Sequence, residues 1–545
     1  MDGKRRVGLT GDWDERISRR TLLRTGGSAA AGVLVLSRTA AAQTAPAFEG
    51  DPFSLGVASG DPTPHGFVLW TRLAPAPLEG GGLDEVTYGV RYEVAKDPDF
   101  RRIVRRGAVR ALPEEAHTVH AEIRRLRPGR EYWYRFKWGR AISEVGRTRT
   151  APHPAWSPAA LRFAFVSCQN YTQGFYPAYA DLAVQDDVEL VVHLGDYIYE
   201  GAGLGAERVR DHVPQGELLS LSDYRTRLAQ YKTDPDLQAA HAAFPWLMTW
   251  DDHEVKNNYA NLDVDPDRPL EDVAARRAAA YRAYWEHAPL SRSRKPMGKD
   301  MNLYRRAHWG QLATFHVLDT RQYRDDQMLT QCAPAERDPA SDYCPVQLDP
   351  ARSILGAEQR DWLFKGLAAT PASGWNVLAN QVGFAAQAYR PQRDVRGFFV
   401  DSWDGYARDR QRVLDFLKER DLKNTVVITG DKHQNSVRNV AERYTDLAGP
   451  PITTEFVGTS IASGGDTPAR TAHGGDPLNP HILFENFQRG YVRVELDQEL
   501  WRSDFRVVET VRRRENVAAS TLKRWIVQNG QPGALPATSE PPAPA

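Results

Sequence analysis

Five short, almost continuously apolar runs constrain the fold of this chain more than any other feature. They lie at residues 163–166, 190–194, 246–250, 375–379 and 426–429. Uninterrupted apolar runs of this length are typical of strands that are buried on both faces of a sheet. Apolar residues recur at helical spacing between them, for example over residues 273–286. Strands that alternate with helices predict a layered α/β domain, which we place at residues 160–510.

The N-terminal part of the chain shows a different pattern. Over residues 48–150, short runs of alternating polar and apolar residues are separated by turn residues, which is typical of an antiparallel β sandwich. The segment at 126–134 resembles the tyrosine corner of a fibronectin-type or immunoglobulin-type strand. Three prolines at 151–159 predict a linker, and a Pro-, Gly- and Ala-rich composition at 530–545 predicts a disordered tail. Because 545 residues are too many for one compact core, we expect two domains, the small all-β domain first.

The first 42 residues have the features of an export signal. Arg19 and Arg20 stand before a weakly hydrophobic stretch at 26–36, and three alanines follow at 40–42. This order resembles a twin-arginine signal peptide with a small-residue cleavage site, which the twin-arginine translocation machinery would recognise. We therefore expect export to the periplasm or the cell exterior. A disordered basic tail is the alternative.

Charge and hydropathy argue against two kinds of partner. The chain has 70 Lys+Arg and 70 Asp+Glu, and removal of residues 1–42 leaves 62 positive against 66 negative side chains. Since the charges balance, no basic patch that would bind nucleic acid is evident. Beyond residues 26–36 no long apolar run remains, so we expect no transmembrane span in the mature chain.

Each of the five apolar runs ends in side chains that can bind a metal ion. These side chains are Cys168, Asp196, Asp251, Asp252, Asn380, Asp431 and His433. Ligands of layered α/β domains gather outside the carboxyl ends of the strands. One such ending means little, because Asp and Asn often follow strands as turn and cap residues. Five endings of the same kind predict a metal site at this edge.

Four stretches carry a resemblance to a known family. They are Gly-Asp-Tyr-Ile-Tyr-Glu at 195–200, Thr-Trp-Asp-Asp-His-Glu at 249–254, Leu-Asp-Thr-Arg-Gln-Tyr-Arg-Asp at 318–325 and Thr-Gly-Asp-Lys-His at 429–433. Together they resemble the metallophosphoesterase superfamily and, more closely, the PhoD-type alkaline phosphatases, over about residues 50–510. The resemblance implies a small β domain followed by an α/β/β/α metallophosphatase sandwich.

The chain departs from the superfamily pattern at four ligand positions. Cys168 stands where the superfamily has an opening aspartate, and Asp252 stands where it has an asparagine. Asn380 and Asp431 stand where it has histidines. Asp196 lies in the intact Gly-Asp block, and the resemblance implies that it bridges two metal ions.

These ligand types divide into two unlike sites. The first combines Cys168, Asp196, Tyr199 and His433, a charge-rich set that suits Fe3+. The second combines Asp196 with Asp252, Asn380 and Asp431, an all-oxygen set that suits one or two Ca2+ ions. The resemblance implies the same metals. The alternatives are a core tyrosine at 199, a structural thiol at 168, a turn-capping Asn380 with Gln381 or water as the ligand, and an Asp251 that shares the metal.

The resemblance implies an exported hydrolase of phosphoric esters that releases phosphate from monoesters and cleaves diesters. Metal-activated hydroxide or an oxo group would attack phosphorus, and His253 would donate to a phosphate oxygen or to the departing alkoxide. Expected substrates are small phosphate esters or phosphodiester polymers and lipids. A phospholipase D-like phosphodiesterase is one alternative, and a calcium-stabilised exported binding protein is another.

Cys332 and Cys344 enclose a short Pro- and Asp-rich loop. In an exported protein this spacing suits a local disulfide, and two free thiols are the alternative. Cys168 would then be the unpaired cysteine, as a metal thiolate requires.

Overall fold

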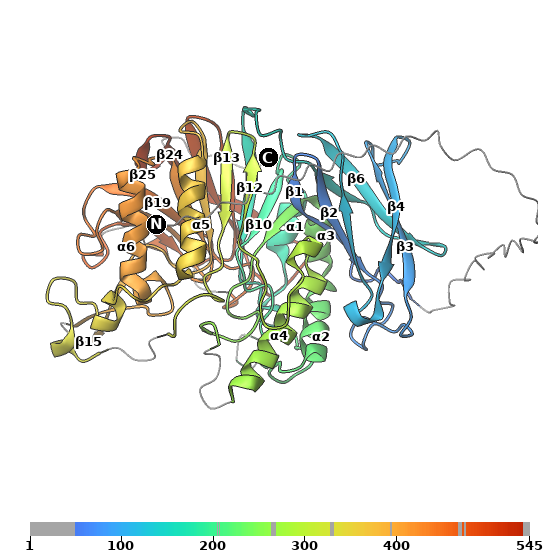
Figure 1. The fold of residues 1–545 in the computed structure, drawn as a ribbon, viewed down its shortest axis with the longest axis horizontal. Coiled ribbons are helices and arrows are strands. Elements are labelled where there is room, and N and C mark those ends of the chain that lie inside the picture. Colours follow the sequence, from blue (N-terminus) through green and yellow to red (C-terminus); the bar gives the residue numbers. More distant parts are fainter. Residues whose placement is uncertain are drawn as a thin grey trace, which may run out of the picture. The chain divides into compact units, whose positions relative to one another are not determined.

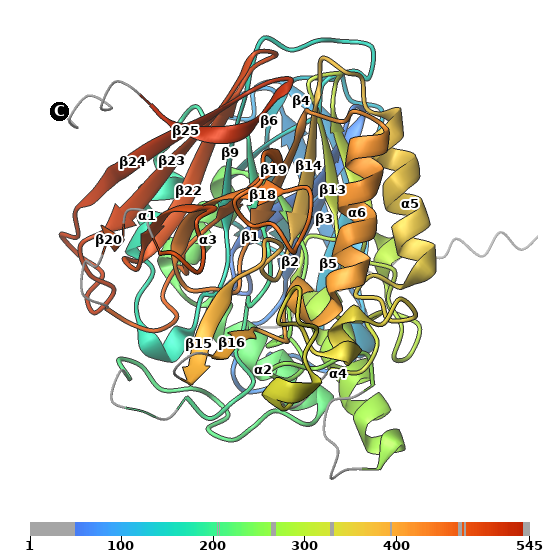
Figure 2. The same cartoon turned by 90° about the vertical axis from the view of Figure 1, so that its left-hand side faces the viewer.

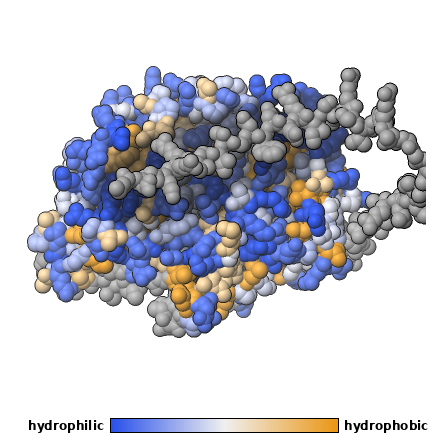
Figure 3. Space-filling model, viewed as in Figure 1, coloured by the Kyte–Doolittle hydropathy of each residue, from blue (hydrophilic) through white to orange (hydrophobic). Residues whose placement is uncertain are grey.

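The computed structural model describes residues 50–203, 205, 208–262, 269–327, 332–392, 395–466, 471–472 and 476–537. These described residues pack as one compact unit. The predicted export signal at 1–42 lies outside the described residues. None of the described helices is both long and apolar enough to cross a bilayer. Hydrophilic residues predominate on the face drawn in Figure 3, and the hydrophobic residues there form small separate groups.

Two large sheets carry the fold (Figure 1). The first sheet has ten strands in the order β25 (Gln531–Pro536), β24 (Ala519–Gln528), β23 (Leu500–Val508), β22 (Gly490–Leu496), β9 (Leu161–Val166), β10 (Leu190–His193), β11 (Pro245–Met248), β1 (Val57–Thr63), β2 (Gly66–Arg72) and β5 (Thr118–Ile123). The second has eight described strands in the order β12 (Arg305–Trp309), β13 (Ala313–Val317), β14 (Trp375–Asn380), β17 (Thr425–Thr429), β19 (Pro451–Val457), β18 (Asn435–Ala441), β21 (Ile482–Asn486) and β20 (Thr471–Ala472). In both sheets the central strands run parallel: β9, β10, β11 and β1 in the first, and β13, β14, β17 and β19 in the second.

Helices cover the outer face of each sheet. The helices are α1 (Pro177–Ala183), α2 (Leu221–Lys232), α3 (Pro235–Ala243), α4 (Leu270–His287), α5 (Gly356–Ala369) and α6 (Ala407–Glu419). The first four pack on the ten-stranded sheet and the last two on the eight-stranded sheet (Figure 2). Short 3-10 helices lie at Pro113–Glu115, Tyr171–Gln173, Arg292–Arg294, Pro334–Glu336, Pro345–Leu348 and Trp403–Tyr406. The layers therefore follow the order α/β/β/α, as predicted.

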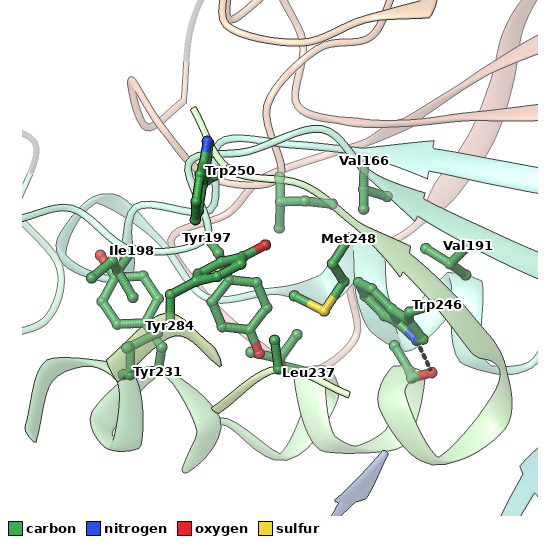
Figure 4. Packing of buried hydrophobic residues seen from close by; sticks show 14 of the residues in the cluster. Val166, Val191, Tyr197, Ile198, Tyr231, Leu237, Trp246, Met248, Trp250 and Tyr284 are labelled. Atoms are coloured by element: carbon green, nitrogen blue, oxygen red, sulfur yellow. Dashed lines mark hydrogen bonds between the residues drawn. The ribbon is translucent and has the colours of Figure 1, made fainter. Parts of the chain in front are cut away.

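Burial on both faces explains the continuous apolar runs. In β9, Phe163 and Phe165 point into the core between the two sheets, whereas Ala164 and Val166 point toward the helices. Leu378 of β14 likewise faces α5 and α6, while its neighbours in the strand face the other sheet. Figure 4 shows the helix side of this packing, where aromatic side chains of the strands, loops and helices interlock. All five predicted strands are confirmed.

Local signals in the sequence fix the helix starts. The Ser220 hydroxyl accepts a hydrogen bond from the Asp223 N–H (3.2 Å), and the Asp223 carboxylate accepts one from the Ser220 N–H (2.8 Å). This reciprocal pair satisfies two N–H groups that the first turn of α2 leaves without partners. Asp234 caps α3 ahead of Pro235, since its carboxylate accepts from the backbone N–H groups of Asp236 and Leu237. The helix predicted at 273–286 lies within α4.

The N-terminal strands form the predicted sandwich. A sheet of β4 (Ile103–Ala111), β3 (Tyr88–Ala95), β6 (Glu131–Trp138), β7 (Ala141–Ile142) and β8 (Gly146–Arg149) packs against β1, β2 and β5. The Tyr132 hydroxyl accepts a hydrogen bond from the backbone N–H of Arg127 (3.1 Å), which is the geometry of a tyrosine corner. Since β1 pairs with β11, one sheet of the sandwich continues into the ten-stranded sheet.

The C-terminal prediction is wrong in part. Residues 531–536 form β25, which pairs with β24, so the described chain is ordered beyond the predicted boundaries at 510 and 530. Trp525, Val527 and Ala534 from these two strands enter the core between the sheets. The Pro, Gly and Ala content that suggested disorder carries no sign of this pairing with a neighbouring strand. Residues 538–545 lie outside the described part.

Both predictions about the cysteines are confirmed. Cys332 and Cys344 form a disulfide, with their Cα atoms 5.8 Å apart. Cys168 is the free cysteine of the described chain and is buried. Residues 151–159 form neither helix nor strand.

Candidate functional site

The candidate site lies where loops from both sheets meet at the carboxyl ends of the parallel strands. Cys168 and Asp196 follow the neighbouring strands β9 and β10 of the ten-stranded sheet, and Asp431 follows β17 of the eight-stranded sheet. Backbone hydrogen bonds join the first two loops, since the N–H of Cys168 donates to Gly195 O (3.1 Å). The site therefore depends on the packing of one sheet against the other.

The structure brings the four residues predicted for the first site together. Ligand atoms of Cys168, Asp196 and His433 all lie within 4.8 Å of one another. The Tyr199 hydroxyl donates to Oδ2 of Asp196 (2.8 Å) and lies 3.1 Å from Nε2 of His433. The Ser463 hydroxyl donates to the Tyr199 oxygen (2.7 Å). A thiol, a carboxylate, a phenol and an imidazole thus converge on one point.

A second cluster shares Asp196 with the first. Ligand atoms of Asp196, Asp252 and His253 lie within 4.8 Å of one another. Burial raises the pKa of Asp431 to about 6 against the opposing charge of Lys432, and the carboxylate of Asp252 adds to the rise. Among the described residues, Asp431 is not part of either group of converging ligand atoms, although it follows the neighbouring strand end.

The side chain of Asn380 forms hydrogen bonds with other groups of the protein. Its Nδ2 donates to Val382 O (2.5 Å) and to the Thr429 hydroxyl (3.2 Å), while its Oδ1 accepts from Trp403 Nε1 (3.0 Å). A carbonyl oxygen has two lone pairs, so one remains on Oδ1 for a cation. These contacts also match the turn-capping role that is the alternative for this residue.

Four of the predicted ligands have a left-handed backbone. The φ angle is +59° at Cys168, +57° at Asp196, +61° at Asp431 and +52° at His433. Residues other than glycine rarely adopt this region, and residues held in sparsely populated backbone regions cost of order 1–3 kcal/mol each. Such residues cluster at functional sites, where the surrounding fold holds them in place. The shared conformation supports a common role for these four side chains.

The buried acidic groups of the site are only partly neutralised by positive groups of the protein. Burial raises the pKa of the Cys168 thiol and of the Tyr199 phenol well above their ordinary values, and Asp196 adds to both shifts. Burial also raises the pKa of Asp196 itself, although His253 opposes the rise. Among the described groups, Oδ1 of Asp196 and Oδ1 of Asp252 have no hydrogen-bond partner. Bound cations would reverse these shifts and occupy the unpaired oxygens, so the residues fit a metal centre.

His253 has the environment of a proton donor. Its Nδ1 lies 2.7 Å from Oε2 of Glu200, and the other oxygen of Glu200 accepts from the backbone N–H of Asn257 (2.7 Å). Burial lowers the pKa of His253, but Asp196, Asp252 and Glu200 together outweigh burial and raise it well above its ordinary value. The neighbouring carboxylates therefore favour the protonated form of this imidazole.

Glu254 is a site residue that sequence reasoning missed. Its carboxylate accepts hydrogen bonds from the backbone N–H groups of Asp196 (3.2 Å), Tyr197 (2.6 Å) and Asp251 (2.8 Å). This buried side chain therefore ties the loop after β10 to the loop after β11. Its place in the block at 249–254 that carries the family resemblance was the available signal, but nothing in the block indicates a role that differs from that of its neighbours.

Arg321 was missed for a similar reason. Its buried guanidinium donates to Oδ1 of Asp251 (2.5 Å) and to both carboxylate oxygens of Asp401 (2.6 and 2.9 Å). It also lies 3.5 Å from Oδ1 of Asp252. Burial raises the pKa of Asp252, but Arg321 and His253 outweigh burial and hold it below its ordinary value. Arg321 thus engages Asp251 and keeps Asp252 ionised.

Comparisons with known proteins identify the family of this chain. Residues 163–505 match the family model described as PhoD-like phosphatase, and residues 38–152 match that of the PhoD-like phosphatase N-terminal domain. Alkaline phosphatase D of Bacillus subtilis (strain 168) is 46% identical over 495 residues, which cover 90% of this chain and 83% of that protein. A solved structure of PhoD superposes with a TM-score of 0.84 at 45% identity, covering 91% of this chain and 94% of that one.

The role of Glu254 can be tested without metal. Glu254→Gln keeps the side-chain size, but one end of the amide is a donor and cannot accept from a buried N–H group. We expect the free energy of unfolding of chelator-treated protein to fall by about 1–3 kcal/mol, measured by urea denaturation. Glu358→Gln, on the exposed start of α5, is the matched control and should change it by less than about 0.5 kcal/mol. Equal unfolding curves for both variants would contradict the assigned role.

Proposed function

The chain belongs to the PhoD-like phosphatase family and is an enzyme of that family, and we propose that it is an exported, metal-dependent hydrolase of phosphoric esters. It releases phosphate from monoesters and also cleaves diesters. Because the family is one of phosphatases, the alternative of a binding protein with purely structural calcium has no support. Turnover of 4-nitrophenyl phosphate and of bis(4-nitrophenyl) phosphate, measured side by side, separates this proposal from a phospholipase D-like diesterase.

One observation carries the proposal: a buried carboxylate, Asp196, belongs to both clusters and keeps one oxygen without a hydrogen-bond partner. Together with Asp196, the residues Cys168, Tyr199 and His433 would form an Fe3+ site. All of these ligands except His433 are anionic when deprotonated. Asp196, Asp252, Asn380 and Asp431 would hold one or two Ca2+ ions, which prefer oxygen ligands. When bound, the metal ions would neutralise phosphate charge and lower the pKa of the attacking water.

The remaining steps belong to the side chains around the centre. Glu200 orients the imidazole of His253 through the hydrogen bond at Nδ1. The protonated imidazole donates to a phosphate oxygen or to the departing alkoxide, which would otherwise leave as a strong base. Arg321 keeps Asp252 ionised and in place, and Glu254 fixes the two loops that carry the carboxylates. Precise positioning of this kind accounts for much of the rate enhancement in phosphoryl transfer.

The metal assignment predicts a coloured protein. A tyrosinate bound to Fe3+ should give a visible charge-transfer band, and metal analysis should find iron and calcium in the purified protein. Tyr199→Phe should abolish the band and lower kcat/KM at least about 100-fold, beyond the loss typical of residues that only support a ligand. Tyr171→Phe, at a nearby tyrosine outside both clusters, should keep the band. A colourless active enzyme that holds only zinc or manganese would overturn the assignment.

The role of His253 predicts a dependence on the leaving group. His253→Gln should lower kcat for an alkyl phosphate by about 10²–10⁴-fold. It should lower kcat for 4-nitrophenyl phosphate far less, because nitrophenolate leaves without a proton. An equal loss for both esters would assign His253 to a phosphate oxygen, and no loss for either would contradict both roles. His308→Gln, at an exposed histidine of β12, is the control.

Export is proposed from the sequence of the first 42 residues. Arg19→Lys together with Arg20→Lys should leave most of the protein in the cytoplasm as uncleaved precursor, because the translocation machinery reads the arginine pair. Cell fractionation with immunoblotting measures this. The pair Arg5→Lys and Arg6→Lys, which lies ahead of the motif, should be exported normally. Normal export of the first variant would refute the twin-arginine route.

A further inference from the structure

Lys432 carries a charge that the proposed mechanism does not use. It lies between two candidate ligands, Asp431 and His433, in the loop after β17. Its Nζ atom lies 4.1 Å from the ring centroid of Phe399. No described side chain forms an ion pair or a hydrogen bond with this ammonium group. An ammonium group has three N–H donors, and an aromatic face satisfies them only in part.

Phe399 belongs to an aromatic pair beside this charge. The rings of Tyr389 and Phe399 lie 5.0 Å apart at 40° to each other. Tyr389 lies in β15 (Ala388–Gln392), and Phe399 directly follows β16 (Val395–Phe398). These two strands form a separate hairpin, which Figure 2 shows below the strands of the eight-stranded sheet. Phe399 is 46% exposed, so part of its ring is open to solvent next to the candidate metal centre.

The cluster combines two kinds of recognition. An unpaired ammonium group at the edge of a metal centre is a partner for an anionic phosphate oxygen. Exposed aromatic side chains stack on planar rings such as nucleobases. This stacking contributes substantially to binding, whichever base is present. The contact between Lys432 and Phe399 joins the two features, since the ammonium group lies over the face of the ring. The charge and the exposed aromatic pair are therefore neighbours that one substrate can contact together.

We propose that Lys432, Phe399 and Tyr389 form a substrate subsite that selects phosphoric esters whose leaving alcohol carries a planar ring, as in a nucleoside. Lys432 binds a phosphate oxygen of the ester, and the aromatic pair stacks on the ring. The inference rests on the proposed function and names the substrate class of the same site. Esters of simple polyols or of lipids lack such a ring and gain nothing from the aromatic pair.

The test compares adenosine 5′-monophosphate with ribose 5-phosphate on the metal-loaded enzyme. In both esters the phosphate leaves the primary 5′ oxygen of a ribose, so the ratio of their kcat/KM values reports mainly the contact with the base. We expect the wild-type enzyme to favour the nucleotide about tenfold, and Phe399→Ala to reduce this ratio to about one. Phe399→Tyr should retain the ratio. Trp156→Ala, which removes an exposed aromatic side chain from the linker region, is the control and should leave the ratio unchanged.

Lys432 has its own readout. Lys432→Met should raise KM for both esters and the inhibition constant of inorganic phosphate about tenfold, with iron and calcium contents equal to those of the wild type, and Lys432→Arg should restore them. Unchanged constants in Lys432→Met, or a metal content that falls in step with activity, would remove Lys432 from the subsite.

Different results would refute the proposed function and the subsite. A metal-loaded wild type that hydrolyses no phosphoric ester would refute the proposed function. Equal kcat/KM values for the two esters, with no change in Phe399→Ala, would refute the subsite alone.

Discussion

The candidate site depends on one buried carboxylate, Asp196, which belongs to both clusters of candidate ligands. Asp196 lies at a strand end where burial strongly disfavours its charge, and Asp251, Asp252 and Glu254 of the loop after β11 disfavour it further. A folded chain tolerates such a concentration of acid only if protons or cations neutralise it. Arg321 and His253 supply part of the positive charge from within the protein. The proposed metal ions would supply the rest. The buried carboxylates that destabilise the metal-free fold are thus the groups that would bind the cations.

The scaffold meets the cost of this arrangement through contacts outside the clusters. Left-handed backbone at four candidate ligands persists because the neighbouring loops leave these residues no alternative. Glu254 contributes by accepting from three backbone N–H groups in two loops. The large interface between the sheets and the helix layers on both sides keep the strand ends in register. Rigid strands beneath strained loops are a general way to hold a reactive constellation in place.

The function-bearing residues were predictable to different degrees. Cys168, Asp196, Tyr199 and His433 were predicted as one set from their positions after apolar runs and from the family resemblance, and the structure brings them together. Asn380 could be placed at the end of β14, but its partner Trp403 lies 23 residues further along the chain and no pattern connects the two. The roles of Glu254 and Arg321 were equally hidden, since all but one of the partners named above, the N–H of Asp251, lie more than fifty residues away.

The sequence by itself determined the identity of the strands, the sandwich that precedes them, and the kinds of donor atoms at the strand ends. It could do so because burial on both faces leaves continuous apolar runs, and because a strand end places the next few residues at a known edge. Tertiary structure alone decided which atoms approach one another around the aspartate that the sequence marks as shared, that β24 and β25 complete the first sheet, and that Lys432 meets an aromatic pair from a separate hairpin. These features depend on distances between segments far apart in the chain, and such distances follow from how the layers pack rather than from any local periodicity.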